Sequence, residues 1–491
     1  MNIYQCIAAL TDNCVKHKLI RDEDRIYCVN RLAAILKIDD PNICRYNENL
    51  SIPQILDLII EYAVNNKIIE DLFDEKEILS ANIMNIFVSK PSEINDKFYS
   101  LYKIGSKTAT DYFYNLSQYS NYIQTQRIAK NISYKVNTEY GDLDITINLS
   151  KPEKNPKDIA AAKNISQTNY PKCLLCIENE GYEGRINHPA RANLRTIRLS
   201  LDDERWYFQY SPYAYYNEHC IILSSEHRDM KIDRKAFSRL IEFVEAFPHY
   251  FLGSNADLPI VGGSILTHDH YQGGKYEFAM AKAQSEYDFN IPDYDNIKCS
   301  IIKWPMSVIR LCSDDKTKIL DTADHILNKW RKYSDESVDI IAFSGDIPHN
   351  TITPIARIRD GKYELDLILR NNRQTKEHPL GIFHPHEDVQ HIKKENIGLI
   401  EAMGLAVLPG RLVNELHEVE KYIAGEKNNV AQYHKKWADQ LKNNFSGDKN
   451  EIEQYVRNAV GNKFLRVLED AGVFKRDEKG QLAFKRFISS L

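Results

Sequence analysis

Residues 257–274 read Asp-Leu-Pro-Ile-Val-Gly-Gly-Ser-Ile-Leu-Thr-His-Asp-His-Tyr-Gln-Gly-Gly. An apolar run leads into His268-x-His270-x-Gln272, and side chains two residues apart project from the same face of a strand. Three polar groups on one face of an apolar strand are costly unless they have partners or a task. The pattern therefore predicts a strand that presents His268, His270 and Gln272 together.

The chemistry of this predicted face suits a histidine nucleophile. A free imidazole has a pKa of about 6.5, so much of it is neutral and nucleophilic at pH 7. Attack of His270 on phosphorus would form a labile phosphoramidate, and Gln272 could donate a hydrogen bond to a phosphoryl oxygen. The flanking glycines, 262–263 and 273–274, let the backbone approach a ligand closely. Taken alone, the His-x-His spacing is more typical of a structural metal-ligand pair or of surface histidines.

Cysteine spacing indicates one candidate metal site. The chain has nine cysteines, too few for a disulfide scaffold of this length, and Cys173-Leu-Leu-Cys176 is the pair with ligand-like spacing. Two thiolates in a Cys-x2-Cys knuckle suit tetrahedral Zn²⁺. His227 and His268, each at the end of a predicted strand, are the candidates for the remaining ligands. The alternative is two cysteines in a turn without a metal.

The bulk composition predicts a globular protein of two or three domains, since 491 residues exceed one compact core. Its 64 Lys and Arg nearly balance 69 Asp and Glu, which argues against broad binding of nucleic acid. No run approaches the roughly 18 apolar residues of a membrane span, and the first residues do not resemble a secretion signal. We therefore expect a cytoplasmic protein that binds neither nucleic acid nor membrane.

Both ends of the chain are predicted to be mainly helical. Apolar residues from Ile55 to Ala63 recur at helical spacing within residues 1–135, and residues 401–491 show charged helical faces. Glycine breaks are expected at Gly425, Gly447 and Gly461. A further helix is predicted from Arg234 to His249. Its apolar face comprises Phe237, Leu240, Ile241, Phe243 and Val244.

Two β-rich stretches, 136–295 and 296–400, lie between these ends, and each carries a His-x-His element. A polar stretch from about 150 to 162 is expected to be a boundary, and a hairpin is predicted about Asp360-Gly361. The repeated pattern suggests an internal duplication. The sequence thus predicts an α+β fold with two antiparallel β units, flanking helices and helical terminal regions.

Further polar residues are candidates for substrate binding. Arg185, Arg191 and Arg195 lie close together in sequence, and such a set suits phosphate or sugar recognition, although a solvated polar loop is the simpler reading. His384-Pro-His386 could bind a metal or close a phosphate site, and Pro385 makes an ordinary central strand improbable there.

The stretch 257–274 resembles the motif of the class II galactose-1-phosphate uridylyltransferases, the form found in Gram-positive bacteria. Thr267 stands where that family usually has Ser or Ala. Segments 187–193 (NHPARAN), 348–357 (PHNTITPIAR) and 378–386 (HPLGIFHPH) resemble the same family. The resemblance runs from about residue 135 to beyond 400.

The resemblance implies a fold related to the histidine-triad superfamily, with two such units in one chain, and a homodimer. It implies transfer of a uridylyl group from UDP-glucose to galactose 1-phosphate through a covalent uridylyl-histidine intermediate. By this resemblance His270 is the nucleophile and Gln272 holds the phosphoryl group. Asn255 and Ser264 resemble groups that touch the uridylyl phosphate. The implied zinc ligands are Cys173, Cys176, His227 and His268.

Three alternatives remain from the sequence. A histidine-triad nucleotide hydrolase would give the uridylyl group to water, although such hydrolases are usually short chains. Another nucleotidyl transferase could use ATP or ADP in place of the uridine substrate. A zinc-stabilised nucleotide-binding protein would have no activity that loss of His270 could abolish.

Overall fold

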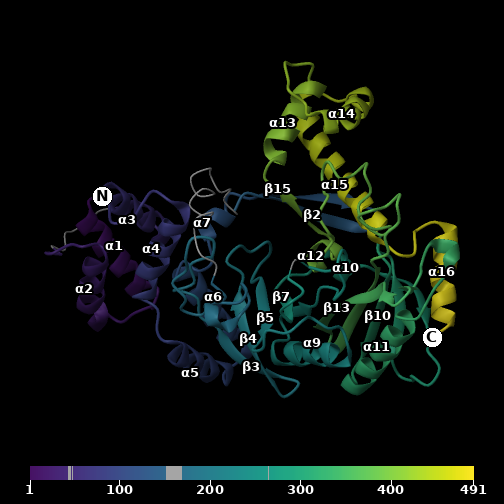
Figure 1. Ribbon diagram of the computed structural model, residues 1–491, viewed down its shortest axis with the longest axis horizontal. Helices are drawn as coiled ribbons and strands as arrows, with labels where there is room; N and C mark the ends of the chain where they lie inside the picture. Colours follow the sequence, from purple (N-terminus) through teal and green to yellow (C-terminus); the bar gives the residue numbers. More distant parts are fainter. Residues whose placement is uncertain (42–45, 47, 151–167, 264) are drawn as a thin grey trace. The chain divides into compact units, whose positions relative to one another are not determined.

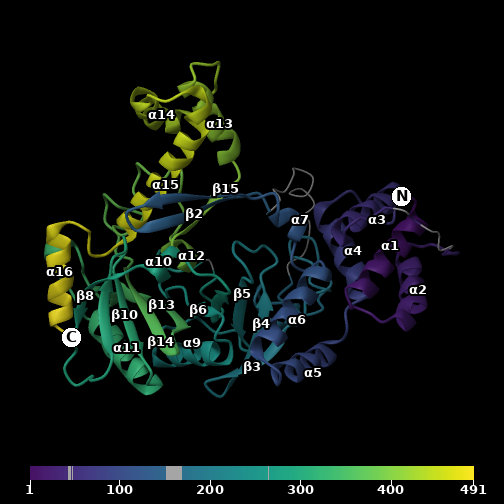
Figure 2. The same ribbon diagram turned by 180° about the vertical axis from the view of Figure 1, so that it is seen from behind.

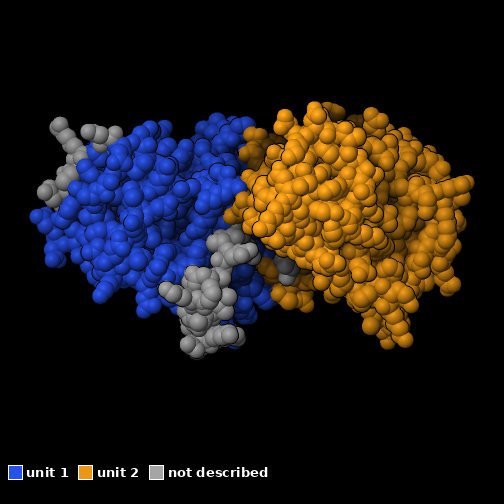
Figure 3. Space-filling model, turned by 90° about the horizontal axis from the view of Figure 1, so that it is seen from above, with its two compact units in different colours: residues 1–130, 150–214, 218–228 blue, residues 131–149, 215–217, 229–491 orange. Residues whose placement is uncertain are grey.

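The computed structural model describes residues 1–41, 46, 48–150, 168–263 and 265–491. The chain forms two compact units, coloured in Figure 3. Unit 1 comprises residues 1–130, 150–214 and 218–228, and unit 2 comprises residues 131–149, 215–217 and 229–491. From residue 151 on, the expected polar boundary lies outside the described residues, and the fourfold division at 135, 295 and 400 stays a prediction.

Unit 1 begins with a helical region, as predicted. Its helices are α1 (Ile3–Lys16), α2 (Arg25–Ile35), α3 (Ile52–Asn65), α4 (Phe73–Asn85), α5 (Pro91–Tyr102), α6 (Ser106–Tyr119) and α7 (Thr125–Ile128), with 3-10 turns η1 (Asp22–Asp24) and η2 (Ile177–Asn179). Asn2 caps α1 by accepting a hydrogen bond from the Gln5 N–H. Ile55, Ile59 and Ala63 of α3 are fully buried in the core shared by α1 to α4. Figure 1 shows these helices gathered at the N-terminal end.

Three antiparallel strands complete unit 1: β3 (Ile197–Leu201), β4 (Glu204–Tyr210) and β5 (Cys220–Ser224). Trp206 and Phe208 of β4 are fully buried, and Phe208 meets the ring of Phe113 on α6 edge to face. The aromatic richness of this stretch therefore serves the core of unit 1, and β5 ends three residues before His227.

Unit 2 contains a large antiparallel sheet whose strands follow the order β7-β6-β13-β14-β10-β9-β8. Their bounds are β6 (Phe251–Gly253), β7 (His270–Gly274), β8 (Ser285–Phe289), β9 (Lys298–Ile302), β10 (Val308–Ser313), β13 (Asn350–Arg359) and β14 (Lys362–Asn371). The predicted hairpin about Asp360-Gly361 joins β13 to β14, and both turn residues have positive φ. A short ribbon pairs β11 (Phe343–Ser344) with β12 (Ile347–Pro348).

A second sheet of unit 2 joins segments far apart in sequence. The hairpin of β1 (Ile132–Thr138) and β2 (Gly141–Asn148) pairs in parallel with β15 (Leu405–Pro409). Gly461 lies within α15 (Ile452–Ala471), so the helix break expected there is wrong. A Cβ at Gly461 would lie 2.5 Å from Val136 Cβ, so glycine lets the helix approach β1 closely. Gly425 does end a helix, with φ +75°.

The remaining helices of unit 2 are α9 (Arg234–Ala246), α10 (Ala279–Lys282), α11 (Lys316–Trp330), α12 (Leu399–Ala402), α13 (Leu412–Ile423), α14 (Gln432–Asn444), α15 and α16 (Glu478–Ser489), with 3-10 turns η3 (Glu336–Val338) and η4 (Lys449–Glu451). The predicted apolar face of α9 is confirmed, since Phe237, Leu240 and Val244 are fully buried. Figure 2 shows α13 and α15 beside β15 and β2. The predicted α+β class with helical ends is thus confirmed. Among the described residues, no helix has both the length and the apolar character to cross a membrane.

Candidate functional site

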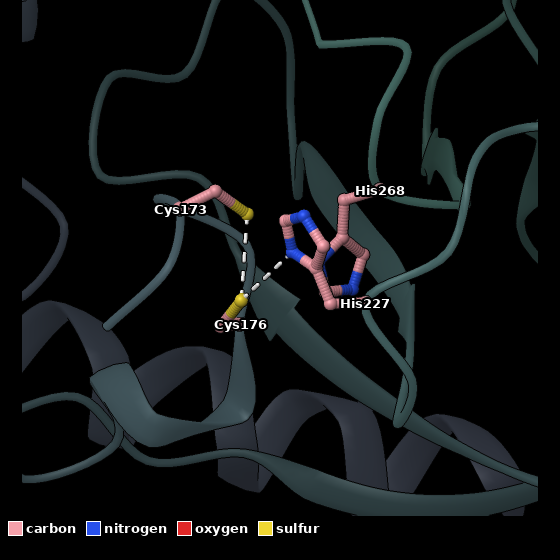
Figure 4. A group of neighbouring side chains, drawn as sticks. All are labelled: Cys173, Cys176, His227 and His268. Atoms are coloured by element: carbon pink, nitrogen blue, oxygen red, sulfur yellow. Dashed lines mark hydrogen bonds between the residues drawn. The ribbon is translucent and has the colours of Figure 1, made fainter. Parts of the chain in front are cut away.

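The cysteine knuckle has the geometry of a metal site. The Sγ atoms of Cys173 and Cys176 lie 3.5 Å apart, and Cys176 Sγ lies 3.2 Å from His227 Nδ1. Together with His268, each residue offers one ligand atom, and these atoms all lie within 4.8 Å of one another (Figure 4). Two thiolates and two imidazoles are a donor set that suits a tetrahedral metal ion. Burial raises the pKa of the Cys176 thiol to about 11, so a bound cation would be needed to keep the thiolate at neutral pH. The four residues could therefore hold a metal ion.

Two buried polar residues support this knuckle from behind. Asn179, the last residue of η2, donates from Nδ2 to the carbonyl oxygens of Cys173 and Cys176, both at 2.8 Å. Its Oδ1 lies 2.7 Å from His188 Nε2. Burial lowers the pKa of His188 to about 4, so the ring is neutral and donates its Nε2–H to this oxygen. Neither residue was predicted from the sequence to support the cysteines. The local signals are the spacing of Asn179, three residues after Cys176, and the place of His188 in the segment 187–193.

His270 is the first residue of β7 and is buried. Its Nδ1 lies 2.8 Å from the carbonyl oxygen of His268. Because a carbonyl can only accept, Nδ1 carries the proton and Nε2 keeps its lone pair. Burial lowers the pKa of His270 to about 4, which keeps the imidazole neutral. The geometry thus leaves the lone pair of Nε2 without a proton. Gln272, two residues along β7, pairs with Gly253 of β6 and is partly exposed.

The alternate residues of this segment face helix α9. Arg239 of α9 places Nη1 3.7 Å from Asp269 Oδ2 and donates a long hydrogen bond, 3.4 Å, to the Tyr271 hydroxyl. Successive side chains of a strand project to opposite faces. His270 and Gln272 therefore project away from α9. The predicted strand through His268 is wrong at its start, because β7 begins at His270 and His268 lies in a bend before it.

Asn255 lies against the glycine pair that leads to the histidines. A Cβ at Gly263 would lie 2.6 Å from Asn255 Nδ2, so only glycine fits there without a shift. Asn255 Oδ1 accepts a hydrogen bond of 2.8 Å from the Leu399 N–H at the start of α12. The predicted substrate contact of Ser264 lies outside the described residues.

The structure directs the two histidines of His384-Pro-His386 to different neighbours. Gly381 has φ +120°, and a Cβ there would lie 3.2 Å from both His384 Cβ and Ile260 Cγ2. His384 is therefore near the loop that leads to β7, and burial lowers its pKa. His386 turns toward α15, where its Nδ1 lies 3.4 Å from Asp470 Oδ1.

The three candidate arginines of unit 1 have different environments. Arg195 is buried, and its guanidinium donates to backbone carbonyls and to Asn85 Oδ1 on α4. Arg185 donates to the Tyr182 hydroxyl at 2.8 Å. Arg191 lies 5.6 Å from the ring centre of Tyr122 and lines a cavity of about 260 Å³. These contacts favour a structural role for Arg195 and leave Arg191 beside a space that a ligand could enter.

Sequence comparisons with known proteins identify one family along the chain. Residues 18–229 match the family described as galactose-1-phosphate uridyl transferase, N-terminal domain, and residues 242–439 match its C-terminal domain. A galactose-1-phosphate uridylyltransferase of Clostridium perfringens is 54% identical over 100% of this chain and 99% of its own length. Galactose-1-phosphate uridylyltransferase 1 of Streptococcus pneumoniae is 55% identical over 98% of both chains.

A similar protein of Fusobacterium nucleatum is 52% identical over 100% of this chain and 99% of its own length. Among solved structures, yeast Ap4A phosphorylase Apa2 is 12% identical, with a TM-score of 0.33 over 62% of this chain and 90% of that chain. The match of both family domains and the full-length relatives establish the conclusion. The chain belongs to the galactose-1-phosphate uridylyltransferases, a family of nucleotidyltransferases of galactose metabolism.

Proposed function

We propose that this protein transfers the uridylyl group from UDP-glucose to galactose 1-phosphate through a covalent intermediate on His270. The observation that carries the proposal is the hydrogen bond from His270 Nδ1 to the His268 carbonyl, which leaves Nε2 unprotonated in a buried imidazole. Membership of the family supports the overall reaction.

The reaction follows as two displacements. The Nε2 lone pair of His270 attacks the α-phosphorus of UDP-glucose, and the P–O bond to glucose 1-phosphate breaks with its electron pair. The uridylylated ring is then cationic, and the His268 carbonyl stabilises the Nδ1–H that bears part of this charge. A phosphate oxygen of galactose 1-phosphate attacks the same phosphorus, the N–P bond breaks, and UDP-galactose forms. Glucose 1-phosphate leaves as a weakly basic phosphate in the first step, and His270 leaves as a neutral imidazole in the second. The mechanism therefore requires no general acid beside His270.

Other residues have proposed roles around this centre. Gln272 would donate from its side-chain amide to an oxygen of the transferred phosphoryl group. The proposed substrate-binding residues are Asn255, Ser264, Arg185, Arg191 and His384, whereas Arg195 and His386 were predicted for this role from the sequence. The contacts of Arg195 with α4 and of His386 with Asp470 favour structural roles for these two. We also propose that the protein acts as a homodimer in the cytoplasm.

The metal is proposed to be Zn²⁺, held by Cys173, Cys176, His227 and His268. Four protein ligands fill a tetrahedral shell, so the ion would serve structure and leave no open position for a substrate. Metal analysis of the purified protein should find stoichiometric zinc, and Cys173→Ser should lose it. Equal metal content in wild type and Cys173→Ser would contradict the assignment.

The decisive experiment uses UDP-glucose without an acceptor. Wild type should release one glucose 1-phosphate per active site and gain the mass of one uridylyl group on His270. His270→Ala should do neither, whereas His417→Ala, which changes an exposed histidine of α13, should behave as wild type. An adduct that persists in His270→Ala would refute the mechanism. Continuous release of UMP without an acceptor would instead indicate the hydrolase.

A further inference from the structure

A buried charged residue lies behind the nucleophile strand. Arg239 and Asp269 are 5% and 3% exposed, and their charged atoms approach to 3.7 Å. We propose that Arg239, paired with Asp269, is a positioning residue that sets the orientation of His270. The inference rests on the proposed function, because it assumes that His270 is the nucleophile.

Helix α9 holds the backbone of Arg239 in a fixed position. Asp233 caps the helix by accepting a hydrogen bond from the Ala236 N–H, and the neighbouring apolar side chains Leu240 and Ile241 are fully buried. The cap and the packing leave α9 little freedom to rotate. The guanidinium of Arg239 therefore has a fixed position, and it can hold the residues of the strand segment that it contacts.

Arg239 contacts two alternate residues of the strand segment. One nitrogen, Nη1, approaches both the Asp269 carboxylate and the Tyr271 hydroxyl. Asp269 directly precedes β7 and Tyr271 is its second residue, so the two contacts hold the residues on either side of His270. Pairing with β6 holds the rest of the strand, and Arg239 adds a restraint at its first residue.

The same pair governs the hydrogen bond that selects the reactive tautomer. The carbonyl of His268 belongs to the peptide that joins it to Asp269, and this carbonyl receives the Nδ1–H of His270. If Asp269 lost its contact with Arg239, this peptide could turn and the carbonyl would leave Nδ1. The proton could then reside on Nε2, where it would block attack on phosphorus.

The ion pair of Arg239 with Asp269 is buried, which indicates a role other than stabilising the fold. Desolvation of two charges offsets much of their attraction, so a buried ion pair is often no more stabilising than apolar residues of the same volume. Asp269 and Arg239 instead hold their charged atoms 3.7 Å apart, which ties the residue before β7 to helix α9. A positioning role explains why the charged residues Arg239 and Asp269 are buried beside β7.

The test measures the rate of the first half-reaction in a single turnover with UDP-glucose alone. Arg239→Met and Asp269→Asn should slow formation of the His270 adduct by about 100-fold, the cost of a small displacement of a reacting group. The KM for UDP-glucose should change little, because neither residue is expected to touch substrate. Arg239→Lys, which keeps the charge, should recover part of the rate. The matched control is Arg234→Met, on the same helix, whose partner Asp321 is exposed; it should react as wild type.

The double variant Arg239→Met/Asp269→Leu separates positioning from stability. It removes both buried charges, so its stability should recover relative to Arg239→Met, while the rate should remain low. Nitrogen NMR of labelled histidine should show Nδ1–H at His270 in wild type and a mixture of tautomers in the variants. Recovery of the rate together with stability, or wild-type rates in Arg239→Met, would overturn the inference. An absence of adduct in wild type would instead refute the proposed function itself.

Discussion

The cysteine knuckle of unit 1 differs from the segment 268–274 of unit 2 in how its functional residues are supported. This segment, which carries the proposed nucleophile, is called the nucleophile strand. Behind Cys173 and Cys176 lies a neutral amide, Asn179, that donates to two backbone carbonyls. Behind His268 and His270 lies an ion pair between side chains, Arg239 and Asp269.

The two kinds of support differ in how much free energy is lost when one partner is removed. An amide that holds carbonyls leaves neutral groups unpaired when it is removed, and each costs a moderate amount of free energy. A buried ion pair that loses one member leaves an uncompensated charge, which costs much more. The two regions should therefore respond to single substitutions on different scales.

The largest effect on stability is expected at the nucleophile strand. Arg239→Ala leaves the Asp269 carboxylate without its guanidinium, and the free energy of unfolding should fall by about 3–5 kcal/mol. Arg234→Ala on the same helix breaks an exposed pair with Asp321 and should cost less than about 1 kcal/mol. Chemical denaturation of the three proteins at pH 7 makes the comparison. Similar losses for both variants would show that the Asp269 site is open to water.

A smaller effect is expected at the knuckle. Asn179→Ala removes two hydrogen bonds of 2.8 Å to the Cys173 and Cys176 carbonyls, and should cost about 1–3 kcal/mol. Affinity for zinc should fall by about 10- to 100-fold, because groups behind the ligands orient them. Competition with a chromogenic chelator measures this affinity. The control Asn66→Ala removes an exposed amide at the end of α3 and should keep wild-type affinity. Unchanged affinity in Asn179→Ala would mean that the cysteine loop holds its shape unaided.

Local periodicity predicted that His270 and Gln272 share one face of a strand. It did not predict the ion pair of Arg239 with Asp269 on the other face. Alternation along a strand is a property of neighbouring residues, so the common direction of His270 and Gln272 could be inferred from sequence. Arg239 lies 32 residues before Tyr271 on a helix whose apolar face was correctly predicted. A charged residue beside that face is normally solvated, and only the approach of Asp269 in three dimensions shows why this one is buried.

Contacts between residues far apart in the sequence also limited the prediction of the fold. The β13–β14 hairpin could be predicted because its turn lies between its strands. The parallel pairing of β2 with β15 joins Asp144 to Leu405, and no local pattern records such a partner. Gly461 was read as a break because helix propensity disfavours glycine, whereas close packing of α15 on Val136 requires it.

The smallest predicted effect concerns two histidines in these regions whose pKa burial lowers to about 4, His188 and His270. In the unfolded chain His188 takes up a proton below about pH 6.5, whereas in the folded protein it stays neutral until about pH 4. Unfolding therefore takes up a proton in this window, and its contribution to stability, complete above pH 6.5, is lost as the pH falls toward 4. His188→Asn should reduce this slope by up to one proton, about 1.4 kcal/mol per pH unit. Denaturation series with chelator present, which excludes proton exchange through a metal, measure the slope in both proteins. An unchanged slope in His188→Asn would mean that His188 does not contribute to the loss of stability in acid.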